Sequence, residues 1–204
     1  MLKSICLAAT CLLVLSTASI AQTAKKTVRK PKPAKATTTT PATAKPAPAK
    51  KEEATEEIQW LTWQQAQDKM AQQPRKVYVD VYTDWCGWCK VMDSKTFKDP
   101  RVAKFMNENF YCIKFNAEKD NDVPFQGKIY SIENGVNELA DKLMNGKRSY
   151  PTSIILMENF QNPMPVPGYL DIPNFEVIMH YLQTNSHTRI PFEEYKKSYV
   201  YLWK

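Results

Sequence analysis

Apolar residues recur along this chain with two alternating spacings, one typical of β-strands and one typical of α-helices. Short apolar runs predict strands at 77–82, 110–115, 152–157 and 164–169. Apolar residues three and four positions apart predict helices at 63–72, 86–97, 135–145 and 173–184, a short helix from Pro100, and a last helical stripe at Phe192, Tyr195, Tyr199 and Leu202. Strands that alternate with helices and close with a hairpin predict an α/β fold, with a central mixed β-sheet flanked by helices on both faces.

Residues that begin and end helices support these bounds. Thr62 and Gln65 have the spacing of a capping box. Asp99 followed by Pro100 is typical of an N-cap and the first helical position. Gly146 predicts the end of the helix at 135–145. Residues 158–162 predict a turn, and the strand at 164–169 tolerates its prolines as an edge strand.

The first 21 residues have the features of a signal peptide. Lys3 precedes the apolar stretch Ile5–Leu15, whose 11 residues are fewer than the about 20 that span a bilayer. Small residues at the cleavage positions predict a mature start at Gln22. An uncleaved anchor is the alternative; a lipoprotein site at Cys11 is disfavoured because it would split the apolar stretch. We therefore expect a periplasmic or otherwise exported protein, with no transmembrane segment in the mature chain.

Residues 22–57 are rich in Lys, Ala, Pro and Thr, a composition that predicts a disordered linker. This segment carries nine basic residues, whereas residues 58–204 carry 18 Lys and Arg and 17 Asp and Glu. The net charge of +7 therefore arises mostly from the N-terminal part, and we expect no nucleic-acid partner. We expect one domain at 58–186 and a helical extension at 187–204 packed on it.

Residues 85–90 read Trp-Cys-Gly-Trp-Cys-Lys and place two cysteines where a strand is predicted to lead into a helix. The N–H groups and the positive dipole end of a helix favour the thiolate of Cys86, and a thiolate is the species that attacks a disulfide. Cys89, one turn later, is placed to resolve the mixed disulfide. A zinc site needs about four ligands, and the only histidines are His180 and His187, so we expect no bound metal. Copper(I), which two thiolates suffice to hold, stays an alternative.

Three further segments make the chain resemble the thioredoxin superfamily from about Ile58 to Thr184. Residues 79–86 resemble the strand that leads into the family's active site, with Asp80 six residues before the first cysteine. Residues 114–116 resemble the family's central strand with its buried lysine, and residues 150–152 resemble its cis-proline loop.

One branch of the superfamily is especially similar. Residues 97–102 and 107–110, and the long gap before the proline loop, resemble exported domains such as the C-terminal domain of DsbD. Two departures concern positions that tune redox potential and substrate contact in the family: Trp88 replaces the proline usual in thioredoxin, and Tyr150 precedes the proline of the loop. They leave the direction of the chemistry and the substrate open.

The resemblance implies a role for four residues in catalysis. Cys86 is expected to be the nucleophile, and Cys89 to release the substrate from the mixed disulfide. Asp80 is expected to accept the proton of Cys89, with a pKa raised by desolvation on an apolar strand. Lys114 is expected to tune Asp80 and Cys89. From the residues alone, Asp80 is also compatible with a helix cap or a surface position, and Lys114 with a solvent-facing one.

Five residues are expected to contact the substrate. Tyr150 and Thr152 present backbone to an extended substrate strand, and Pro151 follows a cis peptide bond, as the resemblance implies. Trp85 and Trp88 flank the thiols; Trp85 is expected to be packed and Trp88 to be exposed.

The function implied is that of an exported thiol–disulfide oxidoreductase, a protein-disulfide reductase or isomerase that acts without a bound cofactor. The resemblance favours a reductase supplied by a membrane or soluble electron donor. Cys112 lies in an apolar strand and is expected to be an inert core residue. Two alternatives stay open: a copper(I)-binding thiol module, and a thioredoxin-like interaction domain without catalysis.

Overall fold

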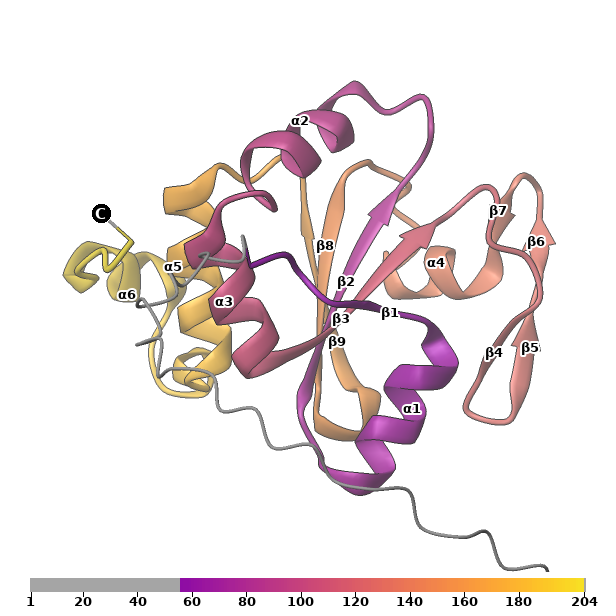
Figure 1. Cartoon of the computed structure of the whole chain (residues 1–204), viewed down its shortest axis with the longest axis horizontal. Helices are drawn as coiled ribbons and strands as arrows, with labels where there is room; N and C mark the ends of the chain where they lie inside the picture. The colour runs from indigo at the N-terminus through magenta and orange to yellow at the C-terminus, as the bar shows by residue number, and fades with distance from the viewer. Residues whose placement is uncertain (1–55, 204) are drawn as a thin grey trace, which may run out of the picture. The chain divides into compact units, whose positions relative to one another are not determined.

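A computed structural model describes residues 56–203 and contains a five-stranded mixed sheet (Figure 1). The order of its strands is β1-β3-β2-β8-β9, in which β1, β2 and β3 are parallel while β8 is antiparallel to both β2 and β9. The strands are β1 (Trp60–Leu61), β2 (Lys76–Tyr82), β3 (Phe110–Asn116), β8 (Thr152–Met157) and β9 (Gln161–Pro167). The signal peptide predicted at 1–21 and the linker predicted at 22–57, up to residue 55, lie outside the described residues.

Helices cover both faces of the sheet, as predicted. They are α1 (Trp63–Gln72), α2 (Gly87–Lys95), α3 (Pro100–Asn109), α4 (Glu138–Leu143), α5 (Ile172–Gln183) and α6 (Phe192–Ser198). The core against one face includes buried residues of α1 and α4, and the core against the other includes buried residues of α2, α3 and α5. This arrangement is a thioredoxin-like α/β fold. Within residues 56–203, no helix combines the length and the apolar character needed to cross a bilayer.

Strand β2 is buried on both faces, and its successive side chains point alternately to one face of the sheet and to the other. Val77, Val79 and Val81 enter the core that α1 and α4 cover. Tyr78 enters the opposite core, beneath α2 and α5. Asp80 has the same parity as Tyr78, so a carboxylate is placed in the sheet below the helix that begins after Cys86.

The helix predicted at 135–145 is shorter in the structure and begins at Glu138. The residues before it form two hairpins that we did not predict, β4 (Val123–Phe125) with β5 (Lys128–Tyr130) and β6 (Ile132–Glu133) with β7 (Val136–Asn137). Each turn has two residues at positive φ, Gln126–Gly127 and Asn134–Gly135, a conformation that suits a two-residue hairpin turn. Asn137 then caps α4, because its Oδ1 accepts the N–H of Leu139.

Strand β9 was predicted at 164–169 and begins three residues earlier, at Gln161, after a 3₁₀ turn at Glu158–Phe160. Pro165 and Pro167 stand opposite Ile154 and Thr152 of β8. Since proline has no N–H, the bonds donated to β8 come from alternate residues such as Met164 and Val166. The prolines therefore remove donors from the outer edge of the sheet, which disfavours the addition of another strand there.

The C-terminal segment ends its helix earlier than predicted, at Ser198, and residues 199–203 are non-helical. Glu176, a buried carboxylate of α5, holds this tail: it accepts the Tyr199 hydroxyl at 3.1 Å, the Trp203 N–H at 3.2 Å and the Leu202 N–H. Arg101 donates to the Trp203 carbonyl at 2.9 Å. Trp203 thus packs against the α3–α5 side of the core.

Candidate active site

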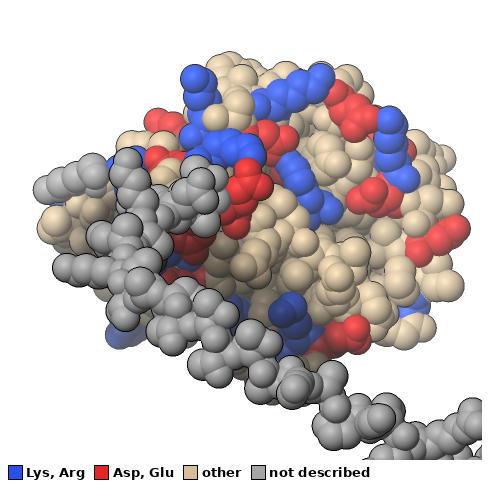
Figure 2. All heavy atoms as spheres, in the orientation of Figure 1, with Lys and Arg blue, Asp and Glu red and all other residues tan. Residues whose placement is uncertain are grey.

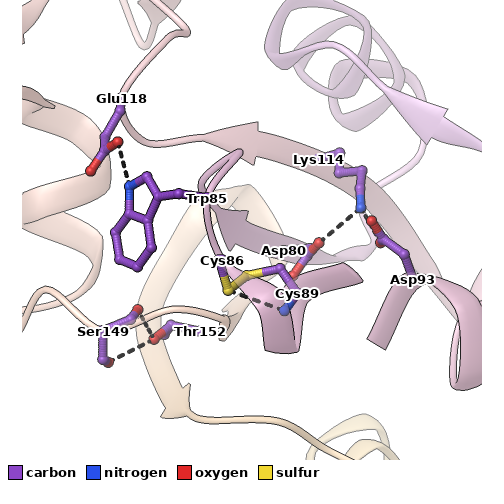
Figure 3. The surroundings of a disulfide bond; sticks show 9 residues. All are labelled: Asp80, Trp85, Cys86, Cys89, Asp93, Lys114, Glu118, Ser149 and Thr152. Atoms are coloured by element: carbon purple, nitrogen blue, oxygen red, sulfur yellow. Dashed lines mark hydrogen bonds and ion pairs between the residues drawn. A yellow bond between two sulfur atoms is a disulfide. The ribbon is translucent and has the colours of Figure 1, made fainter. Parts of the chain in front are cut away.

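Cys86 and Cys89 form a disulfide at the N-terminus of α2 (Figure 3). Cys86 is the N-cap residue, and its Sγ accepts the N–H of Cys89 at 3.1 Å. Each cysteine is only 3% exposed. In the dithiol state the same amide and the positive end of the helix dipole stabilise negative charge on Cys86 Sγ, so Cys86 is the cysteine of the pair favoured as a thiolate.

The loop before β8 lies at the same end of the sheet as the disulfide, because Thr152 is the register partner of Val81 near the end of β2. The Tyr150–Pro151 peptide bond in this loop is cis, as the resemblance implied. Thr152 Oγ1 donates to the Ser149 carbonyl at 2.8 Å, and Gly168 N–H donates to the Pro151 carbonyl at 2.8 Å. The loop is therefore anchored on both sides.

Asp80 lies beneath α2 and is 2% exposed. Its Oδ2 is 3.3 Å from Lys114 Nζ, while its Oδ1 is buried without a hydrogen-bond partner in the described part of the chain. Burial raises the pKa of Asp80 to about 6, against the lowering effect of Lys114. The raised pKa expected from desolvation is confirmed, and the surface and helix-cap alternatives for Asp80 are excluded.

Lys114 is shared by two carboxylates, because Asp93 of α2 forms an ion pair with it as Asp80 does (Figure 3). Desolvation lowers the pKa of Lys114, but Asp80 and Asp93 outweigh that effect and leave it raised. Asp93 stands one helical turn after Cys89, so this pair of contacts ties α2 to β2 and β3 behind the disulfide. Sequence reasoning missed Asp93, although its spacing of four residues from Cys89 places it on the same helix face.

The Lys114 ammonium is partly solvated from one side. It lines a pocket of about 310 Å³ together with Asp93, Trp60 and Phe97. The Trp60 and Phe97 rings lie 5.4 Å and 5.6 Å from Nζ. The pocket exposes Lys114 to solvent, whereas its partner Asp80 stays buried.

Two aromatic pairs flank the disulfide. Trp85 is 66% exposed, so the expectation that it is packed was wrong, and its ring meets Tyr150 edge-on at 5.8 Å. Trp85 lies in the loop between β2 and α2, where its ring contacts Tyr150 and its N–H donates to Glu118 at 2.8 Å. Trp88 is 61% exposed, as predicted, and lies 5.3 Å from the ring of Tyr169.

Cys112 is a buried free thiol on β3, two residues before Lys114. Burial raises its pKa far above the usual value, so it is not reactive as a thiolate in the folded protein. Among residues 56–203, no group of three or more His, Cys, Asp and Glu side chains is arranged to hold a metal ion.

Residues 43–188 match the model of the Thioredox_DsbH family, described as a protein of unknown function, DUF255. The chain belongs to this family. Its sequence is also similar to the sequences of individual known proteins. The chain is 28% identical over 124 residues to the thiol:disulfide interchange protein DsbD of Photorhabdus laumondii, covering 59% of this chain and 19% of that protein.

A second relative is spermatogenesis-associated protein 20 of Mus musculus, 30% identical over 74 residues, which cover 36% of this chain and 9% of that protein. The chain therefore spans less than a fifth of the length of these curated relatives. Among solved structures, a putative disulphide-isomerase from Bacteroides thetaiotaomicron aligns with a TM-score of 0.46 at 23% identity, over 65% of this chain and 97% of that one. A DsbH oxidoreductase aligns with a TM-score of 0.42 at 12% identity, over 61% of this chain and 83% of that one.

The family match, the DsbD relative and the disulfide agree on one general description. This Thioredox_DsbH member is a thioredoxin-superfamily protein that carries the cysteine pair of a thiol–disulfide oxidoreductase.

Proposed function

We propose that this protein is an exported thiol–disulfide oxidoreductase that reduces disulfides of other proteins. The observation that carries the proposal is the Cys86–Cys89 pair at the start of α2, where the Cys89 amide and the helix dipole both favour a thiolate on Cys86. The remaining site residues support the two steps that such a reduction needs.

The first step is attack by the Cys86 thiolate on one sulfur of a substrate disulfide. A bond forms between Cys86 Sγ and that sulfur, and the second substrate sulfur leaves as a thiolate. In the second step Cys89 Sγ attacks Cys86 Sγ, which releases the other substrate thiolate and yields the disulfide of the structure. Two electrons pass to the substrate, and an external dithiol or other reductant must restore the protein.

Asp80 is the residue best placed to assist the second step, in which Cys89 must lose its proton. With a pKa of about 6, its carboxyl is mostly ionised at pH 7 and still basic enough to take a proton. The atom available for this is Oδ1, which has no partner among residues 56–203, since Oδ2 faces Lys114. Lys114 and Asp93 are positioning residues that set the pKa of Asp80.

Substrate binding is proposed at the loop of Tyr150, Pro151 and Thr152 and at the exposed rings of Trp85 and Trp88. Pro151 and Thr152 are buried, whereas Tyr150 is partly exposed. We therefore place an extended substrate strand along Tyr150, at the start of the loop, where its disulfide comes next to Cys86. The anchoring bonds of the loop keep this surface in place before the substrate arrives.

The DsbD relative supports a location outside the cytoplasm. On this proposal residues 1–21 are a cleaved signal peptide, residues 22–57 a spacer, residues 58–186 the redox domain, and residues 187–204 an extension of it. The electron donor is a membrane or soluble dithiol protein.

The decisive experiment is the reduction potential of the Cys86–Cys89 couple against glutathione, measured in the Cys112→Ala variant and in the natural sequence. A value near about −270 mV supports a reductase, and a value near about −120 mV replaces it with an oxidant. If no reversible two-electron couple is found, the enzymatic proposal is wrong. The two sequences are expected to give the same potential because Cys112 is buried and unreactive.

A further inference from the structure

The two flanks of the disulfide differ in charge. On one flank, Trp85 stands edge-on to Tyr150. Its indole N–H donates to Glu118 Oε2 at 2.8 Å (Figure 3). On the other flank, the rings of Trp88 and Tyr169 take part in no side-chain hydrogen bond within the described chain. The first flank therefore combines an exposed aromatic face with a carboxylate, and the second is aromatic alone.

The charge of Glu118 is not balanced within residues 56–203. Its Oε2 accepts from Trp85, and neither carboxylate oxygen has an ion-pair partner among those residues. Lys119, the next residue in the sequence, is paired with Asp84. Arg148, whose charge acts on Tyr150, is paired with Asp141. A half-buried carboxylate is thus held beside the rings of Trp85 and Tyr150 with one oxygen unused.

The adjoining loop adds negative charge. Residues 118–122 contain three acidic residues and one lysine, and the lysine is already paired with Asp84. Figure 2 shows one face of the molecule, on which basic and acidic side chains are interspersed. An approaching chain would therefore meet a negative field on the Trp85 side of the disulfide.

We propose that Trp85, Tyr150 and Glu118 form a subsite for a Lys or Arg side chain that lies next to the reactive cysteine of the substrate. An exposed Trp face attracts a cation through its quadrupole, and a neighbouring carboxylate adds an ion pair to the same group. The hydrogen bond from Trp85 to Glu118 holds ring and carboxylate in one arrangement before the cation binds. This inference rests on the proposed function and gives it a substrate class: protein disulfides flanked by a basic residue.

The experiment compares three disulfide-bonded peptides that differ only in the residue beside one cysteine, which is Lys, Gln or Glu. The protein is reduced, and kcat/KM for each peptide is measured at low and at high salt. We expect the Lys peptide to be reduced roughly three- to tenfold faster than the Glu peptide at low salt, the range for one exposed cation–π contact with an ion pair. High salt is expected to narrow the difference.

The variant that isolates the charge is Glu118→Gln, because a glutamine carbonyl still accepts the Trp85 N–H. It is expected to abolish the preference for Lys, measured as the ratio of kcat/KM for the Lys peptide to kcat/KM for the Glu peptide. The matched control is Glu108→Gln, an exposed acidic residue near the end of α3. Glu108 precedes β3 and Glu118 follows it, so the two lie at opposite ends of the sheet, and the control is expected to keep the preference.

A second readout does not depend on catalysis. The indole N–H signal of Trp85 in a ¹H–¹⁵N NMR spectrum is followed while peptides with serine in place of cysteine are added. The Lys peptide is expected to shift this signal more than the Glu peptide does, and Glu118→Gln to remove the difference. Equal rates and equal shifts for all peptides, or a Lys preference that survives Glu118→Gln, would overturn the subsite.

The two proposals fail in different ways. If no peptide is reduced at all, the oxidoreductase proposal is wrong, and the indole shift still decides whether the cation subsite exists. If all peptides are reduced at equal rates in every variant and the indole shifts are equal, the subsite is wrong and the oxidoreductase proposal stands.

Discussion

Asp80 and Lys114 are direct register partners on the parallel strands β2 and β3, and their side chains form an ion pair of 3.3 Å beneath the disulfide. The ion pair offsets only part of the cost of burying the carboxylate, since the pKa of Asp80 stays raised at about 6. Asp93 explains part of the remainder, because it shares Lys114 and repels Asp80. The site therefore keeps a carboxylate whose ionised form is costly, which is the property that a base for Cys89 requires.

The stability of the protein is expected to depend on pH through Asp80. Its pKa is about 6 when folded and close to 3.8 when unfolded, so between these values the folded state binds the extra proton. The contribution is fully present below about pH 4 and is lost as the pH rises through 6, a loss of about 3 kcal/mol. Asp80→Asn should remove that loss.

Urea unfolding at pH 4 and pH 7.5 checks this prediction. We expect Asp80→Asn to match the natural sequence at pH 4 and to be more stable at pH 7.5, by up to about 3 kcal/mol. Asp68→Asn, a change at an exposed position of α1, serves as the control and should alter neither value. A variant that is less stable than the natural sequence at both pH values would contradict the assignment of a raised pKa.

Asp80 should also govern the pH dependence of the second chemical step. In single-turnover experiments, the rate at which Cys89 releases the substrate sulfur bound to Cys86 should rise with pH as Asp80 ionises, with an apparent pKa near 6. Asp80→Asn should slow this step by about 10²-fold and remove that inflection, while attack by Cys86 continues. Equal release rates in both proteins across pH 5–8 would show that another group or water takes the proton.

Lys114 and Asp93 should shift the titration of Asp80 in opposite directions. Lys114→Met removes the charge that lowers the pKa of Asp80, so that pKa should rise above about 6. Asp93→Asn removes a charge that repels the Asp80 carboxylate and that shares Lys114 with it, so the pKa of Asp80 should fall below about 6. The ¹³C shift of the Asp80 carboxyl, followed by NMR against pH, measures both, and an unchanged midpoint in either variant would refute the coupling.

The two site cysteines should differ in what they trap. Cys89→Ser should accumulate a mixed disulfide with the substrate through Cys86, visible as added mass, because no second thiol resolves it. Cys86→Ser should accumulate little, since Cys89 is not the sulfur at the helix N-cap. Cys112→Ala should behave as the natural sequence does. Substrate attached mainly to Cys89 would reverse the assignment of nucleophile and resolving thiol.

Glu176 should contribute strongly to stability by holding the C-terminal tail. Glu176→Ala leaves the Leu202 and Trp203 amides and the Tyr199 hydroxyl without their acceptor, and should cost about 2–3 kcal/mol in urea unfolding. Tyr199→Phe removes one of these bonds and should cost about 1 kcal/mol. Faster proteolysis at 199–203 in Glu176→Ala than in Tyr199→Phe would locate the effect in the tail, and equal stability of all three proteins would exclude this role.

Local patterns in the sequence were enough for much of the fold. The capping box at Thr62, the Asp99–Pro100 helix start and the apolar runs of β2, β3 and β8 each depend on neighbouring residues, so they are readable without tertiary structure. The hairpin of β6 and β7 was missed because Val136 and Leu139 lie at helical spacing, although Val136 belongs to β7. The Asn134–Gly135 pair was the signal that argued for a hairpin turn there.

The sequence by itself determined the cysteine pair at a helix start and, through resemblance, the burial of Asp80 and the cis bond before Pro151. Only the tertiary structure decided that Lys114 is shared by Asp80 and Asp93, that Trp85 is exposed, and that Glu118 lies against it. The physical reason is distance along the chain: Asp93 and Lys114 are 21 residues apart, and Trp85 and Glu118 are 33 apart. Periodicity reports which face a residue occupies, whereas the packing of α2 over the sheet decides which charges meet on that face.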